Sequence, residues 1–286
     1  MGRIAVVTDS TADLPPDLAA ATGLRVVPLW VTFGDQEFRH GVDITTAEFW
    51  TRLLDPASPF PRTAAPSPGA FRDVFEACFA DGAEAVVCPV IGSQLSGTFQ
   101  AATLGAGTLP DREIHVIDTG TTSMGTGIAA LLAVELATSG MSASDVAARV
   151  TSRLGDIDLF VAVDTLEYLR KNGRLSAARA AVGTILSVKP IITVRDGLVV
   201  LAETPRTRNK ARDRVIELAT AAPIERIAIM HTPTSSTEEV EAFRDRLVAA
   251  IPGGIAPDRV TTALIGASTG PHLGPNLMGA VFLRRA

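Results

Sequence analysis

Hydrophobic and polar residues follow two different rhythms along this chain. In the first half, short apolar runs are each followed by a turn of small polar residues and then by a helical pattern. The runs at 4–8, 85–90 and 114–117 predict strands, and Leu24 to Phe33 is a further strand-like run. This repeated strand, turn and helix order predicts a parallel sheet with helices on both faces.

Two helices of the first half carry clear local signals. Thr45-Thr46-Ala47-Glu48 is a capping box that opens a short helix. Farther along, apolar residues recur at helical spacing on one face, at Phe71, Val74, Phe75, Cys78 and Phe79. Between these helices, residues 56–68 are rich in Pro, Ser and Ala without a regular period, which predicts a loop.

The second half changes character. Apolar runs at 191–194 and 198–203 flank Asp196-Gly197 and predict a β-hairpin. Further elements are expected as strands at 159–163, 227–230 and 260–265, and as helices at 177–188 and 236–250. We therefore expect an α/β protein with two lobes, an N-terminal α/β lobe over 1–156 and a C-terminal α+β lobe over 157–286.

Composition narrows the class of protein. The 286 residues are 47% apolar and 20% charged, as in soluble globular chains. A net charge of −5 and the lack of a Lys/Arg stripe argue against a nucleic-acid partner. Residues 128–137 are apolar but contain Glu135 and are too short to cross a bilayer. Without a signal-peptide pattern or CxxC spacing, we expect a cytoplasmic protein with two buried thiols, Cys78 and Cys88.

Small hydroxyl residues gather in turns that follow the predicted strands. Ligands of open α/β sheets bind beyond the carboxyl ends of strands, where helix N-termini and hydroxyl groups suit an anion. Each such turn also has a structural explanation, because Ser and Thr commonly cap helices. The turns are Thr8 to Thr11, the Pro-rich loop with Thr63 and Ser67, Ile91 to Gln100 with Ser93 and Ser96, and Asp118 to Gly127.

The tail has the most unusual local pattern. His272 lies among glycines and prolines directly after a strand-like run. Glycine and proline fix backbone paths that other residues resist. The segment is either an ordinary turn with an exposed histidine or a shaped loop that aims the imidazole into a pocket.

Several chemistries are disfavoured by spacing. No Gly-Lys-Ser/Thr or GxGxxG pattern supports a nucleotide, and no His/Cys/Asp/Glu spacing indicates a metal site. A serine hydrolase built from Ser96, His272 and either Asp9 or Asp118 remains an alternative. It lacks a GxSxG nucleophile elbow.

Two basic clusters stand apart from the hydroxyl-rich turns. One is Leu169 to Ser176, with Arg170 and Arg174, and the other contains Arg206. Arginine suits phosphate or an acidic partner, although Arg170 is also placed to cap a helix C-terminus.

Together these segments resemble the DegV family, the fatty-acid-binding subunits of bacterial fatty acid kinase. The resemblance spans the chain and is carried by Thr8 to Leu14, Leu95 to Gln100, Leu169 to Ser176 and His272 to Pro275. The chain differs from the usual family pattern at Ala64 and Ala65 (usually Ser-Gln), and at Asn172 and Asn276 (usually Gly).

The resemblance implies two α/β lobes with a lipid cavity between or within them. It implies that a long-chain fatty acid is bound through its carboxylate by Thr63, Ser96 and His272, with Ser93 as a further contact. It also implies that Arg170, Arg174 and Arg206 meet a partner kinase or the transferred phosphoryl group, that the chain itself is not an enzyme, and that no cofactor is needed. Contact with a membrane is expected to be transient at most.

Overall fold

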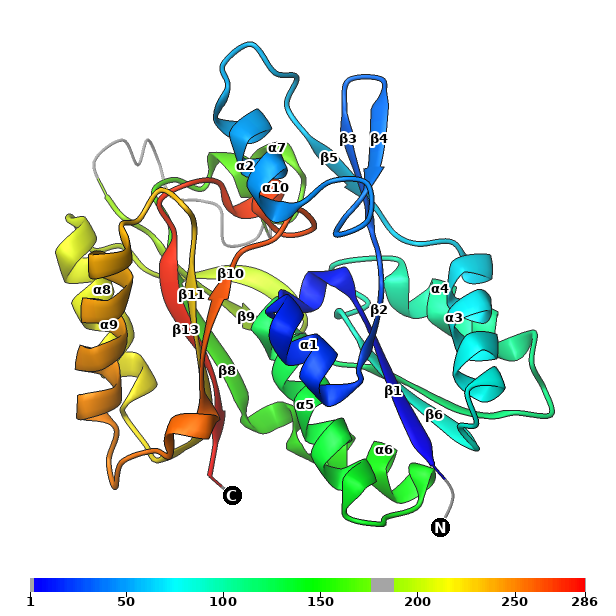
Figure 1. Cartoon of the computed structure of the whole chain (residues 1–286). Helices are drawn as coiled ribbons and strands as arrows, with labels where there is room; N and C mark the ends of the chain where they lie inside the picture. Colours follow the sequence, from blue (N-terminus) through cyan, green and yellow to red (C-terminus); the bar gives the residue numbers. More distant parts are fainter. Residues whose placement is uncertain (1–2, 176–187, 286) are drawn as a thin grey trace.

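Three sheets organise the chain in the computed structural model, which describes residues 3–175 and 188–285 (Figure 1). The first sheet is parallel throughout, in the order β2-β1-β6-β7. Its strands are β1 (Ile4–Asp9), β2 (Arg25–Val27), β6 (Ala85–Val90) and β7 (Glu113–Asp118). β6 is buried along its whole length, as expected for a central strand covered on both faces.

Helices cover both faces of this parallel sheet, as the sequence predicts. α3 (Pro68–Ala80) and α4 (Thr98–Gly107) pack on one face through a core that includes Phe71 and Phe75. α5 (Met124–Thr138) and α6 (Ala143–Arg153) pack on the other. The predicted α/β fold class is therefore confirmed for the first half of the chain.

The second sheet is mostly antiparallel, in the order β10-β9-β8-β13-β11-β12, with β11 and β12 parallel. Along β8, Leu159 and Val161 face the core shared with the first half, while Phe160 and Ala162 face the opposite side. Its strands are β8 (Ile157–Ala162), β9 (Ile191–Arg195), β10 (Leu198–Glu203), β11 (Ile224–His231), β12 (Val260–Leu264) and β13 (Met278–Arg284).

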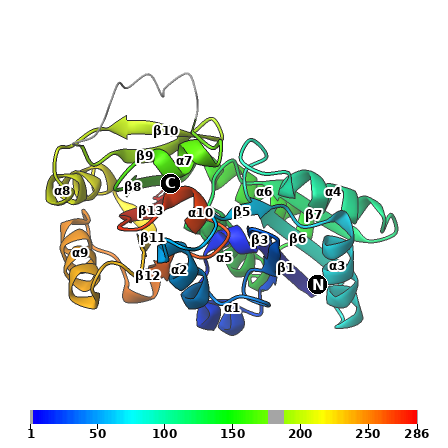
Figure 2. The ribbon, with the colours of Figure 1, turned by 90° about the horizontal axis from the view of Figure 1, so that it is seen from above.

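Helices α8 (Arg208–Ala219) and α9 (Thr237–Ala250) cover the outer face of the second sheet. Seen from above, α5 lies between the two large sheets (Figure 2). One hydrophobic core, which contains Ile128 of α5 and Val161 of β8, joins the two halves. The strands of the first sheet all precede residue 156, and the strands of the second sheet all follow it. Because a shared core joins the two halves, a division into two lobes at residue 156 stays a prediction.

A third, smaller sheet stands above the others in Figure 1. It has the order β4-β3-β5, with β3 (Trp30–Phe33), β4 (Gln36–Arg39) and β5 (Arg62–Ala64). The remaining helices are short: α1 (Pro16–Thr22), α2 (Thr46–Leu54), α7 (Glu167–Lys171) and α10 (Gly270–Leu273). The predicted capping box at Thr45 and Glu48 is present and starts α2.

Two expectations from the sequence are wrong in detail, and one strand was not expected. The run from Leu24 to Phe33 is two strands in different sheets, because Pro28 cannot donate a ladder hydrogen bond and the chain turns there. The Pro-rich loop contains β5, whose Thr63 pairs with Val31. The tail returns as β13, a central strand that the sequence analysis did not predict. The helix expected at 177–188, like Ser176, falls almost wholly outside the described residues.

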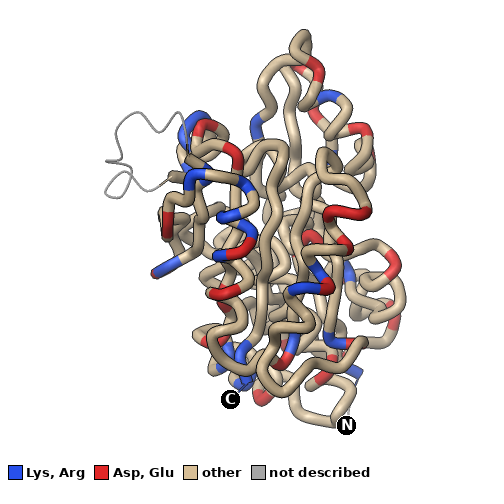
Figure 3. Tube along the Cα trace, turned by 90° about the vertical axis from the view of Figure 1, so that its left-hand side faces the viewer, with Lys and Arg blue, Asp and Glu red and all other residues tan. Residues whose placement is uncertain are grey.

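Charged residues of both signs are interleaved along the chain (Figure 3). Many of them pair with one another, as Arg153 does with Asp156 and Glu225. Within residues 3–175 and 188–285, no helix combines the length and apolar character needed to cross a membrane. Cys78 and Cys88 are buried and unbonded, as predicted.

Candidate functional site

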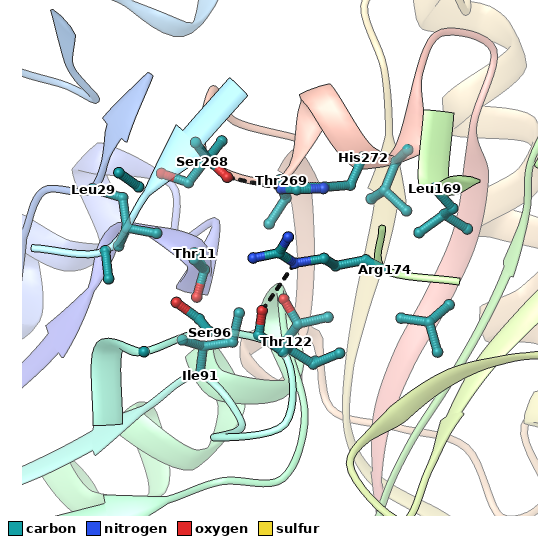
Figure 4. Close-up of a pocket in the computed structure, with 17 residues that line it drawn as sticks. Thr11, Leu29, Ile91, Ser96, Thr122, Leu169, Arg174, Ser268, Thr269 and His272 are labelled. Atoms are coloured by element: carbon teal, nitrogen blue, oxygen red, sulfur yellow. Dashed lines mark hydrogen bonds between the residues drawn. The ribbon is translucent and has the colours of Figure 1, made fainter. Parts of the chain in front are cut away.

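A cavity of about 250 Å³ opens where the strand ends of the first sheet meet the small sheet and the tail (Figure 4). The turns after β1, β6 and β7 supply Thr11, Ile91 and Thr122 to its wall. The complete wall combines apolar and polar residues: Thr11, Leu29, Thr63, Ala64, Ala65, Ile91, Leu95, Ser96, Gly97, Thr122, Leu169, Arg174, Val199, Ser268, Thr269, His272 and Leu273. Such a surface fits an amphiphilic ligand.

Thr63 and His272 meet in this cavity. The Thr63 hydroxyl oxygen lies 3.0 Å from Nε2 of His272. β5 fixes Thr63 through its pairing with β3, and α10 carries His272. The short helix α10 ends at Leu273 and is capped by Gly274, whose positive φ of 70° suits glycine. The tail is therefore a shaped loop that holds the imidazole in the cavity wall.

The protonation state of His272 decides which groups are free to bind a ligand. Burial, and then the positive charge of Arg174, lowers the pKa of His272 to about 4, so the imidazole is neutral at pH 7. Its Nδ1 atom is buried and has no hydrogen-bond partner among the described residues. Because unpaired buried N–H groups are rarer than under-used acceptors, we assign the proton to Nε2. Nε2–H then donates to Thr63, whose own hydroxyl hydrogen is free.

The Ser96 hydroxyl is a second donor that is free to bind a ligand, and its hydrogen bonds show why. Its oxygen accepts the backbone N–H of Thr98 at 3.3 Å and lies 2.8 Å from the Thr98 hydroxyl. Thr98 is fully buried, so its hydroxyl hydrogen is best used by donating to Ser96. The hydrogen of Ser96, which lines the cavity, then remains available.

Arg174 also lines the cavity, which corrects its expected position away from the hydroxyl-rich turns. In Figure 4 its guanidinium lies between the labelled side chains of Ser96 and His272. Nε donates to the carbonyl of Leu95 at 3.2 Å, and one terminal nitrogen donates to that of Asn172 at 2.9 Å. Arg174 forms no salt bridge with the described residues, so its charge faces the cavity uncompensated by a carboxylate.

The other predicted residues do not line this cavity. Ser93 is exposed in a neighbouring hollow, and its backbone N–H donates to Asp118, so its expected contact is not brought to the site. Arg170 and Arg206 are exposed as well. Arg174 is exposed too, but of these three arginines it is the one that lines the cavity.

The geometry does not support the hydrolase alternative. The Ser96 hydroxyl is bonded to Thr98 and the His272 imidazole to Thr63, so neither is bonded to the other. Asp9 and Asp118 accept hydrogen bonds from backbone groups instead of orienting the imidazole. Nor do the described residues include a group of three or more His, Cys, Asp or Glu side chains arranged to hold a metal ion.

Comparison with known proteins identifies the family of this chain. Residues 3–285 match a family described as "Uncharacterised protein, DegV family". The chain belongs to the DegV family. A DegV domain-containing protein from Streptomyces coelicolor is 34% identical to it over 99% of both chains.

Solved DegV structures superpose on nearly the whole chain. One, described as fatty acid binding of a DegV family protein from Thermus thermophilus, has a TM-score of 0.87 at 33% identity and covers 99% of this chain and 100% of its own. Another, described as DegV, a fatty acid binding protein from Bacillus subtilis, has a TM-score of 0.86 at 29% identity over 100% of both chains. The mixed α/β architecture is thus the DegV fold.

Both asparagines that replace glycines of the usual DegV pattern tie the tail loop to neighbouring segments. The Asn172 side chain donates to the carbonyl of Pro271 at 2.6 Å. The Asn276 side chain donates to Asp164 at 3.0 Å, and Asp164 also accepts from Lys189 and Arg208. In this DegV protein, both basic segments are therefore anchored to the loop that carries His272.

The sequence analysis missed one buried carboxylate that supports the DegV site. Asp13 accepts hydrogen bonds from the Ser123 hydroxyl at 2.6 Å, from the backbone N–H of Gly266 at 3.0 Å and from the hydroxyl of Thr269 at 2.8 Å. Burial raises the pKa of Asp13 to about 7. Asp13 thus links the first turn, α5 and the segment that leads into α10. The available signal was that Asp13 belongs to the segment Thr8 to Leu14, which carries the family resemblance.

Proposed function

We propose that this protein binds a long-chain fatty acid in the cavity and presents its carboxylate to a partner kinase. The observation that carries the proposal is the bonded pair Thr63 and His272, beside Ser96 and Arg174, at the wall of a partly apolar cavity. Fatty acid binding by the similar DegV proteins of T. thermophilus and B. subtilis supports the same ligand class.

The polar residues suit a carboxylate. Thr63 and Ser96 offer free hydroxyl hydrogens, and Arg174 offers N–H groups and a positive charge. A buried carboxylate is costly unless it is hydrogen-bonded or paired with a cation. Since His272 is neutral, its role is to orient and polarise Thr63 rather than to supply a charge. Arg174 therefore adds a cation to the two hydroxyl groups and the imidazole that the family resemblance implies.

The apolar wall suits an alkyl chain. Leu29, Ile91, Leu95, Leu169 and Val199 line the same cavity. Each CH₂ group that leaves water for such a surface stabilises the complex by about 0.8 kcal/mol. Carboxylate contacts would then fix the orientation of the ligand, and the alkyl chain would provide most of the affinity.

A kinase would transfer the γ-phosphoryl group of its nucleotide to a carboxylate oxygen, giving an acyl phosphate. The exposed arginines Arg170 and Arg206 are proposed to meet that partner or the phosphoryl group, because guanidinium groups bind phosphate and carboxylate in a bidentate manner. Arg174, which lines the cavity, is proposed to bind the carboxylate of the fatty acid.

The binding proposal is tested by denaturing the protein purified from a bacterial host and identifying the released lipid by mass spectrometry. We expect a fatty acid in near-equimolar amount, reduced in a Thr63→Val, His272→Ala double variant. If the natural protein released no fatty acid and bound none added to it, the binding proposal would be wrong.

The kinase proposal needs a separate assay. Acyl phosphate formation is measured with a fatty acid kinase catalytic subunit and the lipid-loaded variants Arg170→Ala and Arg206→Ala. Arg112→Ala, an exposed arginine before β7 and so at the other end of the sheet, is the matched control. We expect Arg170→Ala and Arg206→Ala to lose phosphorylation while they keep a normal lipid content. The control variant should keep both. Equal rates in all three variants would exclude the proposed docking role.

A further inference from the structure

Ser268 carries a hydroxyl hydrogen that none of the described residues uses. Ser268 is buried, with 2% of its surface exposed, yet it lines the cavity. Its oxygen lies 2.7 Å from the Ser10 hydroxyl and 2.8 Å from Nδ1 of His40. The direction of each hydrogen bond in this group can be derived from its neighbours.

His40 donates to Ser268. The backbone N–H of Ala267 donates to Nε2 of His40 at 3.3 Å, so Nε2 is an acceptor. Burial lowers the pKa of His40 to about 4, and the neutral ring therefore carries its one proton on Nδ1. Nδ1–H then donates to the oxygen of Ser268.

Ser10 also donates to Ser268. The backbone N–H of Leu29 donates to the Ser10 oxygen at 2.8 Å, and the two serine hydroxyls share one hydrogen between them. If Ser268 donated, the Ser10 hydrogen would be left in a buried position outside the cavity wall. Buried polar hydrogens are nearly always paired, so Ser10 donates and the hydrogen of Ser268 is left to point into the cavity.

An acceptor lies in the same turn. Thr11 follows Ser10, lines the cavity and donates its own hydroxyl hydrogen to Asp9. Its oxygen keeps a lone pair that can accept a further bond. In Figure 4, Ser268 and Thr11 lie on the Leu29 side of the cavity, with Thr11 beside Ser96, whereas Leu169 lies on the other side of His272. A donor and an acceptor therefore share the Leu29 side of the cavity, next to the residues proposed to bind the carboxylate.

We propose that Ser268 and Thr11 form a second polar subsite that recognises a hydroxyl group on the acyl chain of the ligand. This proposal rests on the proposed fatty-acid function and narrows its substrate class to hydroxy fatty acids. The ligand hydroxyl would accept from Ser268 and donate to Thr11. An unsubstituted chain would leave the Ser268 hydrogen without an acceptor in a buried position, which is unfavourable.

The test compares a C18 fatty acid with a positional series of its monohydroxy derivatives. Affinities are measured by displacement of a fluorescent fatty acid from the wild-type protein, Ser268→Ala and Ser93→Ala, the last being a matched exposed serine outside the cavity wall. For at least one position of the hydroxyl, we expect wild-type and Ser93→Ala to bind the hydroxy acid about tenfold more tightly than the parent acid. In Ser268→Ala this preference disappears, while affinity for the parent acid is equal or higher.

Three results would overturn the subsite. They are no preference at any hydroxyl position, a preference that survives Ser268→Ala, or an equal loss of parent and hydroxy acids in that variant, which would assign Ser268 to the carboxylate. Ser268→Cys, which keeps the volume but is a weak donor, serves the same comparison if thermal unfolding shows that Ser268→Ala is misfolded. Failure of the fatty-acid proposal itself looks different, because wild-type and Ser93→Ala would then bind none of these acids.

Discussion

The imidazole of His272 and the hydroxyl of Thr63 are hydrogen-bonded at 3.0 Å although they are 209 positions apart in the sequence. One comes from the tail and the other from a strand of the small upper sheet. Neither residue can hold the other unless both halves of the chain are folded, so the bond reports on the assembled site.

Replacement of Thr63 by Val should weaken fatty-acid binding with little effect on the fold. The change keeps the shape of the side chain but removes the hydroxyl that is proposed to reach the carboxylate. A lost hydrogen bond to a charged group is worth roughly 1.5–3 kcal/mol, so we expect roughly a 10- to 100-fold loss of affinity. Titration with a fluorescent fatty acid measures it, and Ser93→Ala should bind as the wild type does. Equal affinities for Thr63→Val and Ser93→Ala would remove Thr63 from the site.

Replacement of Arg174 by Gln should raise the pKa of His272. The positive charge of Arg174 is one of the causes that hold this pKa at about 4, after burial. Without the charge, the imidazolium form becomes less unfavourable, so protonation occurs at higher pH. NMR titration of the imidazole signals in the ligand-free protein measures the shift. An unchanged or lower pKa would mean that the guanidinium does not face His272. The same variant should also bind fatty acids more weakly.

Replacement of Asp13 by Asn should cost most stability at low pH. The pKa of Asp13 is raised from 3.8 to about 7 in the folded protein, so the folded state binds a proton that the unfolded state has released between these values. The contribution of Asp13 is therefore complete below about pH 4 and is lost as pH rises through 7. Urea unfolding of both proteins from pH 4 to 8 measures the difference in free energy of unfolding. We expect this difference to shrink as pH rises, and a difference that grows with pH would contradict the raised pKa.

Replacement of Gly279 by Ala should destabilise the protein strongly. A Cβ atom there would lie 2.5 Å from the backbone oxygen of Phe160 and 2.6 Å from Cα of Val161 in the neighbouring strand. Backbone atoms cannot move aside as a flexible side chain does, and overpacking of this kind costs about 1–3 kcal/mol or more. Gly107→Ala is the control, since nothing lies within 4 Å of its Cβ and it is in a helix. Thermal unfolding should show a marked fall in Tm for the first variant and no fall for the second.

The sequence predicted the parts of the fold that have strong local signals. The capping box at Thr45, the Asp196-Gly197 hairpin and the apolar strand at 85–90 are set by neighbouring residues, and the structure contains all three. The split of the run after Leu24 was missed although Pro28 marks it. β13 was not predicted, because its apolar run follows directly on a glycine-rich segment that is typical of a loop.

Prediction of the candidate site was limited in the same way, since local patterns indicate only those residues whose position does not depend on distant segments. Thr63, Ser96 and His272 were found through turns after strands and a family pattern, and they do line one cavity. Arg174 was assigned elsewhere because its position depends on the turn after α7 being held against the tail by Asn172. Ser268 could not be recognised as a donor from sequence, since that depends on His40 and Ser10, far away along the chain.

The position of β13 has a consequence for synthesis of the protein on the ribosome. β13 lies between β8 and β11, and both of these strands precede it in the chain. A nascent chain can therefore assemble the parallel sheet early, as N-terminal regions generally fold first. The second sheet stays divided until its central strand has left the exit tunnel. His272 lies shortly before that strand, so the cavity wall that contains His272 can be completed only after the segments that supply the other walls have been made.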